Sequence, residues 1–328
     1  MIRLKEVLRS PFSVLRSPFS VLRSPFSVLR SSPKLRLFPA LIIIISVLAL
    51  SACGDRDEMT DTPPFTNIIE TVRVPGGSFY LGRCAQQDPN GGEPRTVESF
   101  HIGRFPVTQG QWYQVMGTWP SYFDGTNYHT GTTPVEPVYN RNNLPVEHVN
   151  WYEALVFANT LSMLDGFLPV YMISGSTDPY YWGDVPTTNN TTWNNVQELP
   201  LADGWRLPTY VEWEFAAKGG SGSSGTYFIF SGSNTVGDVA WYRHNWDAGD
   251  MSLRRTHPVT TLAPNALGLH HMSGNVWEWV YDWFTPNSVR VVRGGSWYSI
   301  EGYARSAFQG NHAPYARTNN RGFRLVRP

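Results

Sequence analysis

The chain has 328 residues, of which 14% are aromatic and 16% charged, with 13 Trp, 29 Gly and 25 Pro. Residues 1–36 carry eight Lys or Arg and one acid, residues 37–53 carry none, and residues 54–328 hold 18 basic and 25 acidic groups, a net charge of −7. This acidic body argues against nucleic acid as a partner, because phosphate binding needs clustered Lys and Arg. The aromatic and loop-forming composition predicts a loop-rich globular fold without long helices.

Residues 1–52 are predicted to form a lipoprotein signal segment. Three copies of the heptapeptide RSPFSVL occupy residues 9–29, and the apolar run LIIIISVLAL follows at 41–50. Ten apolar residues are too few to span a bilayer, but they match the hydrophobic region of a secretory signal. The run ends in Leu-Ser-Ala-Cys, which resembles the lipobox of bacterial lipoproteins. This resemblance predicts lipidation of Cys53.

Cleavage before Cys53 would leave the mature chain attached to a membrane by its acyl chains. Residues 53–70 are polar and acidic and contain proline, as is typical of a tether, and residues 71–328 are expected to form the folded domain. Gly54, not Asp, follows the cysteine. By resemblance to enterobacterial sorting, this predicts a lipid-anchored protein of the bacterial outer membrane, on the cell surface, with the periplasmic face as the alternative.

The first half of the domain predicts a hairpin, a strand and two helices. Residues 72–82 alternate around a Gly-Gly pair, which indicates a β-hairpin, and residues 101–107 are a strand candidate. Thr108 is the expected cap of a helix that ends at Gly117. The clearest helix begins at Asn150 or Trp151 and ends at Gly166, because its apolar residues form one stripe at helical spacing. That stripe consists of Trp151, Ala154, Leu155, Ala158, Leu161 and Leu164.

The second half predicts a third helix and long connections. Residues 171–200 are rich in turn-forming residues, which indicates an extended insertion. Thr209 opens a capping box, so a helix should run from there to Gly219-Gly220. The sequence GGSGSSG at 219–225 lacks the Lys and Ser or Thr of a phosphate-binding loop and is expected to be flexible. The chain shows no long alternation of strands and helices, which argues against a doubly wound sheet.

The C-terminal segment from Arg290 to Pro328 has regular ends and an irregular middle. Val291-Val292 form a β-prone run before Gly294-Gly295, and residues 322–326 are expected to form a closing strand. Between them, aromatic, small and polar residues follow neither a strand nor a helix period. This composition suits a surface that contacts a ligand, and an ordinary loop rich in Ser, Gly and Asn is the alternative.

Several blocks, in the same order along the chain, resemble the formylglycine-generating-enzyme (sulfatase-modifying factor) family. They cover about residues 72–328 and include Gly76-Gly-Ser-Phe, Pro106-Val-Thr-Gln, Leu144-Pro-Val-Glu-His-Val-Asn-Trp, Trp205-Arg-Leu-Pro-Thr-Tyr-Val-Glu-Trp-Glu, Pro264-Asn-Ala-Leu-Gly-Leu, Ser273-Gly-Asn-Val-Trp-Glu-Trp, Arg293-Gly-Gly-Ser-Trp and Gly322-Phe-Arg-Leu. The resemblance implies an α+β, C-type lectin-like fold of the formylglycine-generating-enzyme subtype. Such a fold has two main helices, small antiparallel sheets and much irregular structure.

The oxidases of this family use two cysteines placed shortly after the Gly-Gly-Ser-Trp block. The corresponding positions of this chain hold Ser299 and Ala304. A hydroxyl cannot replace a low-pKa thiolate as nucleophile or soft copper ligand, and Ala offers no reactive group. We therefore expect a non-catalytic protein, with a divergent exported enzyme of the formylglycine-generating or sulfoxide-synthase type as the alternative.

The chain also resembles the variable lipoproteins of diversity-generating retroelements of the treponemal type. In these proteins, mutation of template adenines rewrites chiefly Asn codons, which can become Tyr, Ser, Ile, Gly, Phe, His, Ala, Thr, Val or Asp. The resemblance implies that residues 290–328 are a variable ligand-binding region, within which Glu301 and Gln309 do not fit the codon rule. The implied ligand-binding positions are Val292, Tyr298, Ser299, Ile300, Gly302, Tyr303, Phe308, Gly310, Asn311, His312, Ala313, Tyr315, Ala316, Thr318 and Asn319.

The expected partner is a protein or glycan ligand, bound by a monomeric domain. Tyr298, Tyr303, Phe308 and Tyr315 would make the main contacts, because aromatic side chains bury a large area with few rotatable bonds. The expected support beneath them consists of Trp277, Trp279, Trp283 and Trp297, with Arg293 and Arg305 as buried hydrogen-bond donors.

No cofactor is expected, and structural Ca²⁺ is the one alternative. Family members often bind Ca²⁺ near this Gly-Asn-x-Trp-Glu block, which implies Glu278 and the backbone oxygens of Gly274 and Val276 as ligands. The position usually filled by Asn or Asp holds His271, a poor ligand for a hard cation. A zinc site at His270-His271 lacks evident further ligands nearby.

Overall fold

The computed structural model describes residues 68–82, 92–124, 140–220, 228–247 and 253–328. The predictions for the signal segment, for Cys53 and for most of the tether and the glycine-rich loop lie outside these residues. Within them, no helix has the length and apolar character needed to cross a membrane.

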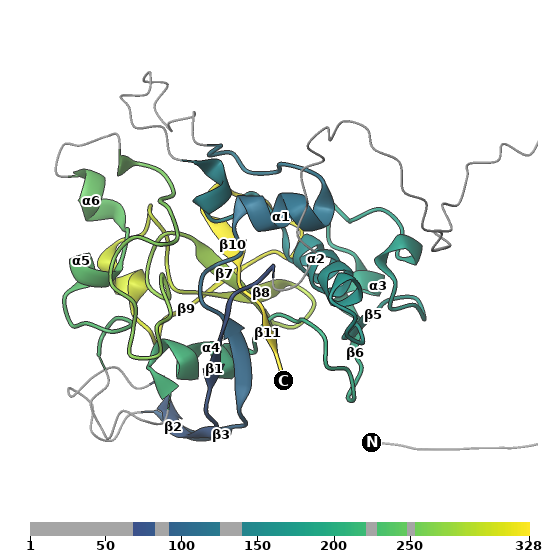
Figure 1. The fold of residues 1–328 in the computed structure, drawn as a ribbon, viewed down its shortest axis with the longest axis horizontal. Coiled ribbons are helices and arrows are strands. Elements are labelled where there is room, and N and C mark those ends of the chain that lie inside the picture. Colours follow the sequence, from purple (N-terminus) through teal and green to yellow (C-terminus); the bar gives the residue numbers. More distant parts are fainter. Residues whose placement is uncertain (1–67, 83–91, 125–139, 221–227, 248–252) are drawn as a thin grey trace, which may run out of the picture. The chain divides into compact units, whose positions relative to one another are not determined.

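A four-stranded sheet of order β10-β7-β8-β9 positions the C-terminal segment (Figure 1). Its strands are β7 (Trp277–Thr285), β8 (Val289–Arg293), β9 (Gln309–His312) and β10 (Arg321–Phe323). The first three are antiparallel, and β10 runs parallel to β7. The expected antiparallel sheets therefore include one parallel pair, because the chain crosses from the β9 edge to the opposite edge before it forms β10.

The remaining strands form three small antiparallel sheets. One has the order β1-β4-β11 and joins β1 (Thr71–Val74), β4 (Phe100–Gly103) and β11 (Val326–Arg327). The others pair β2 (Gly77–Leu81) with β3 (Glu93–Val97), and β5 (Tyr171–Met172) with β6 (Gln197–Glu198).

The predicted hairpin at 72–82 is wrong, because β1 and β2 belong to different sheets. At Gly76, between them, a Cβ atom would lie 2.8 Å from the carbonyl oxygen of Val97. Only glycine fits at this position, because the backbone of another segment approaches so closely. A Gly-Gly pair looks the same in the sequence whether it serves such an approach or a hairpin turn. The predicted closing strand at 322–326 is also divided, since β10 ends at Phe323 and β11 begins at Val326.

The three predicted helices are confirmed as α1 (Gln109–Met116), α2 (Trp151–Leu164) and α4 (Tyr210–Ala217). Each begins with a capping box, in which the cap side chain bonds the backbone of the third helical residue and that residue's side chain bonds back. Shorter helical turns are η1 (Arg141–Asn143), η2 (Pro179–Tyr181), α3 (Thr191–Asn194), α5 (Val236–Val239), α6 (Arg243–Asp247) and η5 (Glu301–Ala304).

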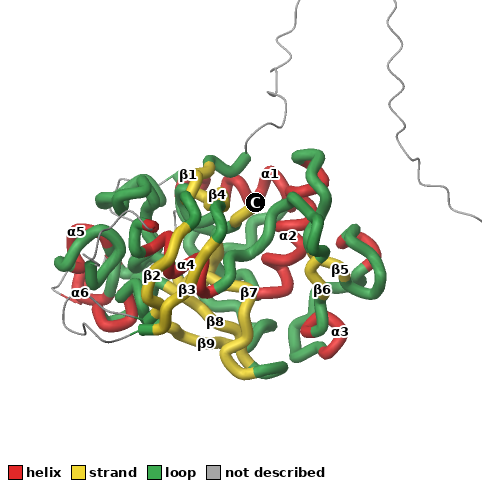
Figure 2. The backbone as a smooth tube through the Cα atoms, turned by 90° about the horizontal axis from the view of Figure 1, so that it is seen from below, coloured by secondary structure: helices red, strands yellow, loops and turns green. Residues whose placement is uncertain are grey.

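Two hydrophobic clusters lie on opposite faces of the four-stranded sheet. Figure 2 shows the helices that contribute to them, α2 on one side of β7 and α4 on the other. Trp279, Val292 and Phe323 face the cluster that contains the buried stripe of α2. Val280 and Val291, one residue away in each strand, face the cluster that contains α4. This alternation is what a sheet buried on both faces requires.

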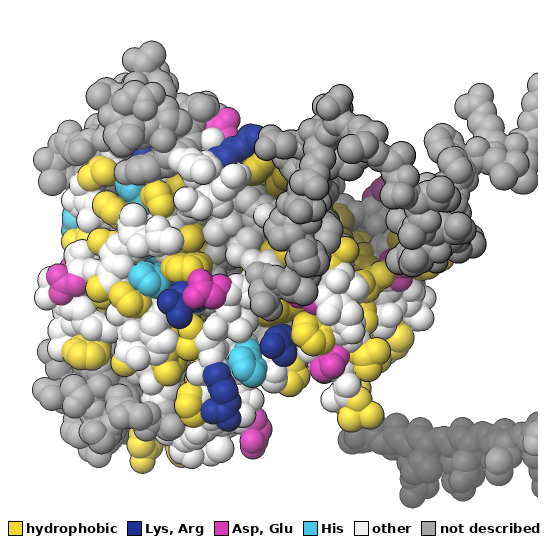
Figure 3. Space-filling model, viewed as in Figure 1, with side chains coloured by type: hydrophobic (Ala, Val, Ile, Leu, Met, Phe, Trp, Pro, Cys, Tyr) yellow, Lys and Arg dark blue, Asp and Glu magenta, His cyan; other side chains and the backbone are white. Residues whose placement is uncertain are grey.

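Residues 171–200, predicted to be an extended insertion, contribute side chains to the hydrophobic core. Trp182 and Trp193 from this stretch are buried in the same cluster as α2 and lie 5.7 Å apart, ring to ring. On the face drawn in Figure 3, charged side chains are scattered among apolar and uncharged polar ones, consistent with the low charge content.

Candidate ligand-binding face

The C-terminal segment leaves the sheet through a tight turn at Gly294 and Gly295. Both residues have positive φ, of 89° and 75°. A Cβ atom on Gly294 would lie 3.2 Å from the ring of Trp213, and one on Gly295 would lie 3.0 Å from the backbone of Tyr303. The pair therefore lets the chain turn out of β8 and pass close to its own later residues, which form η5 and then β9.

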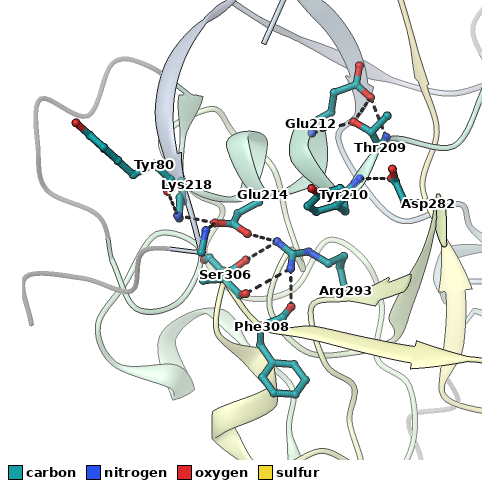
Figure 4. A network of polar contacts seen from close by, with 12 residues as sticks. Tyr80, Thr209, Tyr210, Glu212, Glu214, Lys218, Asp282, Arg293, Ser306 and Phe308 are labelled. Atoms are coloured by element: carbon teal, nitrogen blue, oxygen red, sulfur yellow. Dashed lines mark hydrogen bonds and ion pairs between the residues drawn. The ribbon is translucent and has the colours of Figure 1, made fainter. Parts of the chain in front are cut away.

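A buried ionic cluster supports the start of β9 (Figure 4). The guanidinium of Arg293 pairs with the carboxylate of Glu214, and its Nη1 donates to the carbonyl of Phe308 at 2.9 Å. Glu214 also accepts from Lys218 Nζ at 2.6 Å. Burial lowers the pKa of Arg293, and the Glu214 carboxylate opposes that shift. Arg293 thus connects α4 to the loop that ends at Phe308.

The rest of the segment is held mainly through its backbone carbonyls. His148 N donates to Thr318 O at 3.0 Å, and Trp151 N donates to Pro314 O at 2.9 Å. The indole of Trp297 donates to Asn319 O at 3.1 Å. Because main-chain acceptors make these bonds, a change of side chain at Thr318 or Asn319 would leave them in place.

An aromatic cluster occupies the centre of the segment. Tyr303 and Phe308 lie 4.8 Å apart, ring centre to ring centre, and each is within 6.2 Å of Trp277. Tyr303 is 42% exposed, and Tyr298 and Ile300 are each 45% exposed. These half-open aromatic and aliphatic side chains can supply contact area to a ligand.

Most predicted ligand-binding positions face outward. Between Ser296 and Arg321, one of the fourteen predicted positions is buried, whereas six of the other twelve residues are. The positions that are at least partly accessible, which we call the candidate face, are Tyr298, Ile300, Gly302, Tyr303, Phe308, Gly310, Asn311, His312, Ala313, Tyr315, Ala316, Thr318 and Asn319. At Gly310 the backbone alone is accessible, because a Cβ atom there would lie 3.0 Å from Val292 and 3.1 Å from the ring of Trp277. Along the chain, the candidate face is interrupted chiefly by residues outside the predicted set, several of which are buried.

Two predicted positions do not fit and are corrected. Val292 is 1% exposed, because it lies in the middle of β8 and packs in the α2 cluster. Ser299 is 7% exposed, and its hydroxyl accepts a 3.1 Å hydrogen bond from the backbone of Ser296. Neither side chain is available to a ligand in this structure.

The predicted support is partly right. Trp279, Trp297 and Arg293 are buried as expected. Trp277 and Trp283 are only half-buried, and Arg305 is exposed, so it is not a buried hydrogen-bond donor. Sequence reasoning missed Glu214, although an acid between Trp213 and Phe215 in an apolar helix is a signal of a buried ion pair.

The positions that correspond to the oxidase cysteines hold no reactive pair. Ala304 is fully buried, and the Ser299 hydroxyl lies 3.0 Å from that of Ser296. Across the described residues, no group of three or more His, Cys, Asp or Glu side chains is arranged to hold a metal ion.

The residues predicted to bind Ca²⁺ do not fit that ion. Glu278 is fully buried, and Arg324 donates to both of its carboxylate oxygens at 2.7 Å. The Trp213 indole donates to the same carboxylate, also at 2.7 Å. A calcium ion bound with Gly274 and Val276 would have to displace a guanidinium that already neutralises this charge. Burial also lowers the pKa of neighbouring His271 to about 3, which leaves its imidazole neutral.

The model of the sulfatase-modifying factor enzyme 1-like domain family matches residues 57–328. The chain belongs to this family. Its α+β, C-type lectin-like fold is therefore confirmed, as are the small sheets and few helices expected from the resemblance.

Two proteins with different names illustrate the range of relatives to which this chain is similar. Chaperone protein LppX of Paenibacillus barcinonensis is 33% identical over 89% of this chain and 99% of its own length. The mouse protein named inactive C-alpha-formylglycine-generating enzyme 2 is 27% identical over 78% of this chain and 84% of its own length. The family thus includes a member described as inactive.

Among solved structures, Treponema denticola variable protein 1 is 33% identical to this family member, with a TM-score of 0.64. The match covers 79% of this chain and 95% of that protein. This similarity supports the interpretation of the chain as a variable protein of the treponemal type.

Proposed function

We propose that the protein is a non-catalytic, ligand-binding lipoprotein, attached to the bacterial outer membrane through Cys53 and displayed on the cell surface. Its ligand is a protein or a glycan, bound by a monomeric domain through the candidate face. The C-terminal region at 290–328 is rewritten by a retroelement.

One observation carries the proposal: between Ser296 and Arg321, thirteen of the fourteen positions that fit the codon rule are at least partly accessible, whereas six of the other twelve residues are buried. Rewriting is harmless to the fold only under that division, because core side chains set stability. The carbonyl contacts of Thr318, Asn319 and Pro314 add to it, since they do not depend on side-chain identity.

The absence of cysteine at Ser299 and Ala304 supports a non-catalytic role. The buried methyl group of Ala304 and the hydrogen-bonded hydroxyl of Ser299 offer no thiolate to a metal or a substrate. The similarity to the variable protein and to the inactive mammalian protein favours binding over catalysis.

The DNA downstream of the gene provides the first test. We expect a near-copy of the codons for 290–328 that differs only where the copy has adenine. A copy that differs at other bases as often would contradict rewriting. Purified protein that retains copper or iron and consumes oxygen would instead support the divergent-enzyme alternative.

A further inference from the structure

Four arginines are buried within residues 290–328, and three of them have acceptors. Arg293 pairs with Glu214, and Arg324 pairs with Glu278. Arg290 lies between the indoles of Trp151 and Trp283, at 3.7 and 3.4 Å, and donates to the carbonyls of Tyr281 and Asn194.

Arg321 is the fourth, and its guanidinium has no acceptor among the described residues. It is 5% exposed, and both Nε and Nη1 are buried without a hydrogen-bond partner. The third nitrogen, Nη2, is not among the buried unpartnered atoms and makes no protein hydrogen bond, so it is the one that keeps contact with solvent. A buried donor without an acceptor costs roughly 1–3 kcal/mol, and more when it is charged.

The surroundings of Arg321 place it beneath the candidate face. Its guanidinium lies over the ring of Trp279, 5.0 Å from the ring centre. The same ring packs edge-on against His312, a candidate-face residue 6.4 Å away. The backbone N–H of Arg321 donates to the carbonyl of Thr318, another candidate-face residue. Burial lowers the pKa of Arg321 to about 9, so the group remains a cation at neutral pH.

We propose that Arg321 forms the base of a recessed anion-binding subsite within the candidate face, which takes a carboxylate or sulfate group of the ligand. The inference rests on the proposed function. Arg321 is not among the rewritten positions, so differently rewritten copies would share this requirement while the surrounding side chains set which anionic ligand fits.

The chemistry follows from the geometry of the cation. A guanidinium N–H donates a strong, charge-assisted hydrogen bond to a carboxylate oxygen. Only Nη2 of Arg321 reaches solvent, which favours a small terminal anion bound through one oxygen over an extended polyanion. The net charge of −7 over residues 54–328 means that an anionic ligand needs such a local cation to offset general repulsion.

The first test uses acetate as the probe. In a ¹⁵N-labelled wild-type domain, sodium acetate should shift the Nε–H signal of Arg321 in a saturable way at constant ionic strength. The Nε–H signal of Arg290 should not move and is the internal reference, because this side chain lies between two indoles and its Nη1 and Nη2 donate to carbonyls. An unmoved Arg321 signal would overturn the proposal.

A variant pair adds a second measurement. R321Q should weaken acetate binding by at least about tenfold, as expected for loss of a charged donor. R305Q removes an exposed arginine of the same segment and should bind acetate like the wild type. Equal losses in both variants would mean general charge attraction and would reject the subsite. If R321Q does not fold, the wild-type titration decides alone.

Two further probes, a hexaglutamate peptide and a trigalacturonate, distinguish a protein carboxylate from a glycan carboxylate. Binding of one of them above the level of acetate, lost in R321Q, would identify an acidic protein or an acidic glycan. The double variant Tyr298→Ala and Tyr303→Ala should keep acetate binding. The two proposals can therefore fail separately. A missing downstream template would refute rewriting but not the subsite. An Arg321 signal that acetate does not shift would refute the subsite but not rewriting.

Discussion

The face of the four-stranded sheet that carries Trp279 is covered in two ways. At one end, α2 packs side chain against side chain: Phe157 lies 5.4 Å from Phe323, ring to ring, and is fully buried. Beside it, residues 313–316 cover the same cluster, with Tyr315 against it and Pro314 bonded through its carbonyl to α2. The first half is held by side-chain packing, whereas a backbone hydrogen bond adds to the contact of Tyr315 in the second, so the two halves should differ in how much substitution they tolerate.

The largest effect is expected in the α2 half. Phe157→Ala removes a ring packed against Trp112 and Phe323 and should lower the free energy of unfolding by about 3–5 kcal/mol. Urea unfolding measures the change, and Tyr298→Ala on the candidate face is the control. A loss below about 1 kcal/mol for Phe157→Ala would remove the contrast between the halves.

Next comes the buried ionic cluster that joins α4 to β8. Glu214→Gln leaves Arg293 and Lys218 buried without their carboxylate, which should cost about 3 kcal/mol or more. The matched change Glu153→Gln, in the partly exposed pair with Arg317, should cost under about 1 kcal/mol. Equal costs in urea unfolding would show that burial of the Glu214 cluster does not matter.

A pH dependence of intermediate size should come from His271. Its pKa is about 3 in the folded protein and near 6.5 when unfolded, so the unfolded state binds the proton first as the pH falls. The stability from its neutral form is complete above pH 6.5 and should have fallen by about 2 kcal/mol at pH 5. Burial raises the pKa of Glu147, which acts in the opposite direction, so the test compares wild type with His271→Asn at both pH values. The same pH slope in the two proteins would refute the assignment.

The smallest effect belongs to the candidate face. Ile300→Asp, a change that a rewritten Asn codon can produce, should alter the free energy of unfolding by less than about 0.5 kcal/mol, because half of this side chain is in solvent. Thermal unfolding at equal protein concentration checks it. A loss of several kcal/mol would show that the face is part of the core.

The helices were predictable because their signals are local. Thr108, Asn150 and Thr209 each cap a helix through the residue three positions later, and the apolar stripe of α2 has a fixed period. The hairpin at 72–82 failed because a strand's partner is set by distant residues: β1 pairs with β4, which lies beyond two further strands. Local alternation does not encode that choice.

The candidate site was predictable only in outline. The codon rule selects residues without regard to their environment. It could not separate Val292, which is buried inside β8, from exposed predicted positions such as Tyr298 and Ile300. Glu278 was predicted to bind Ca²⁺, but its carboxylate pairs with Arg324, which lies 46 residues later in the chain. Arg321 gave no signal, because the absence of an acceptor is visible only when the surrounding elements are in place.

The candidate face is followed by framework residues rather than by a free end. After residue 320 the chain still has to supply β10, the Arg324 partner of Glu278, and β11 at the edge of the first sheet. A copying error that shifts the reading frame or stops translation within the face would delete all three. Such a product would expose the apolar side chains around Trp279 and become a substrate for proteases. If the proposed rewriting takes place, the fold would therefore remove truncated versions before they reach a ligand.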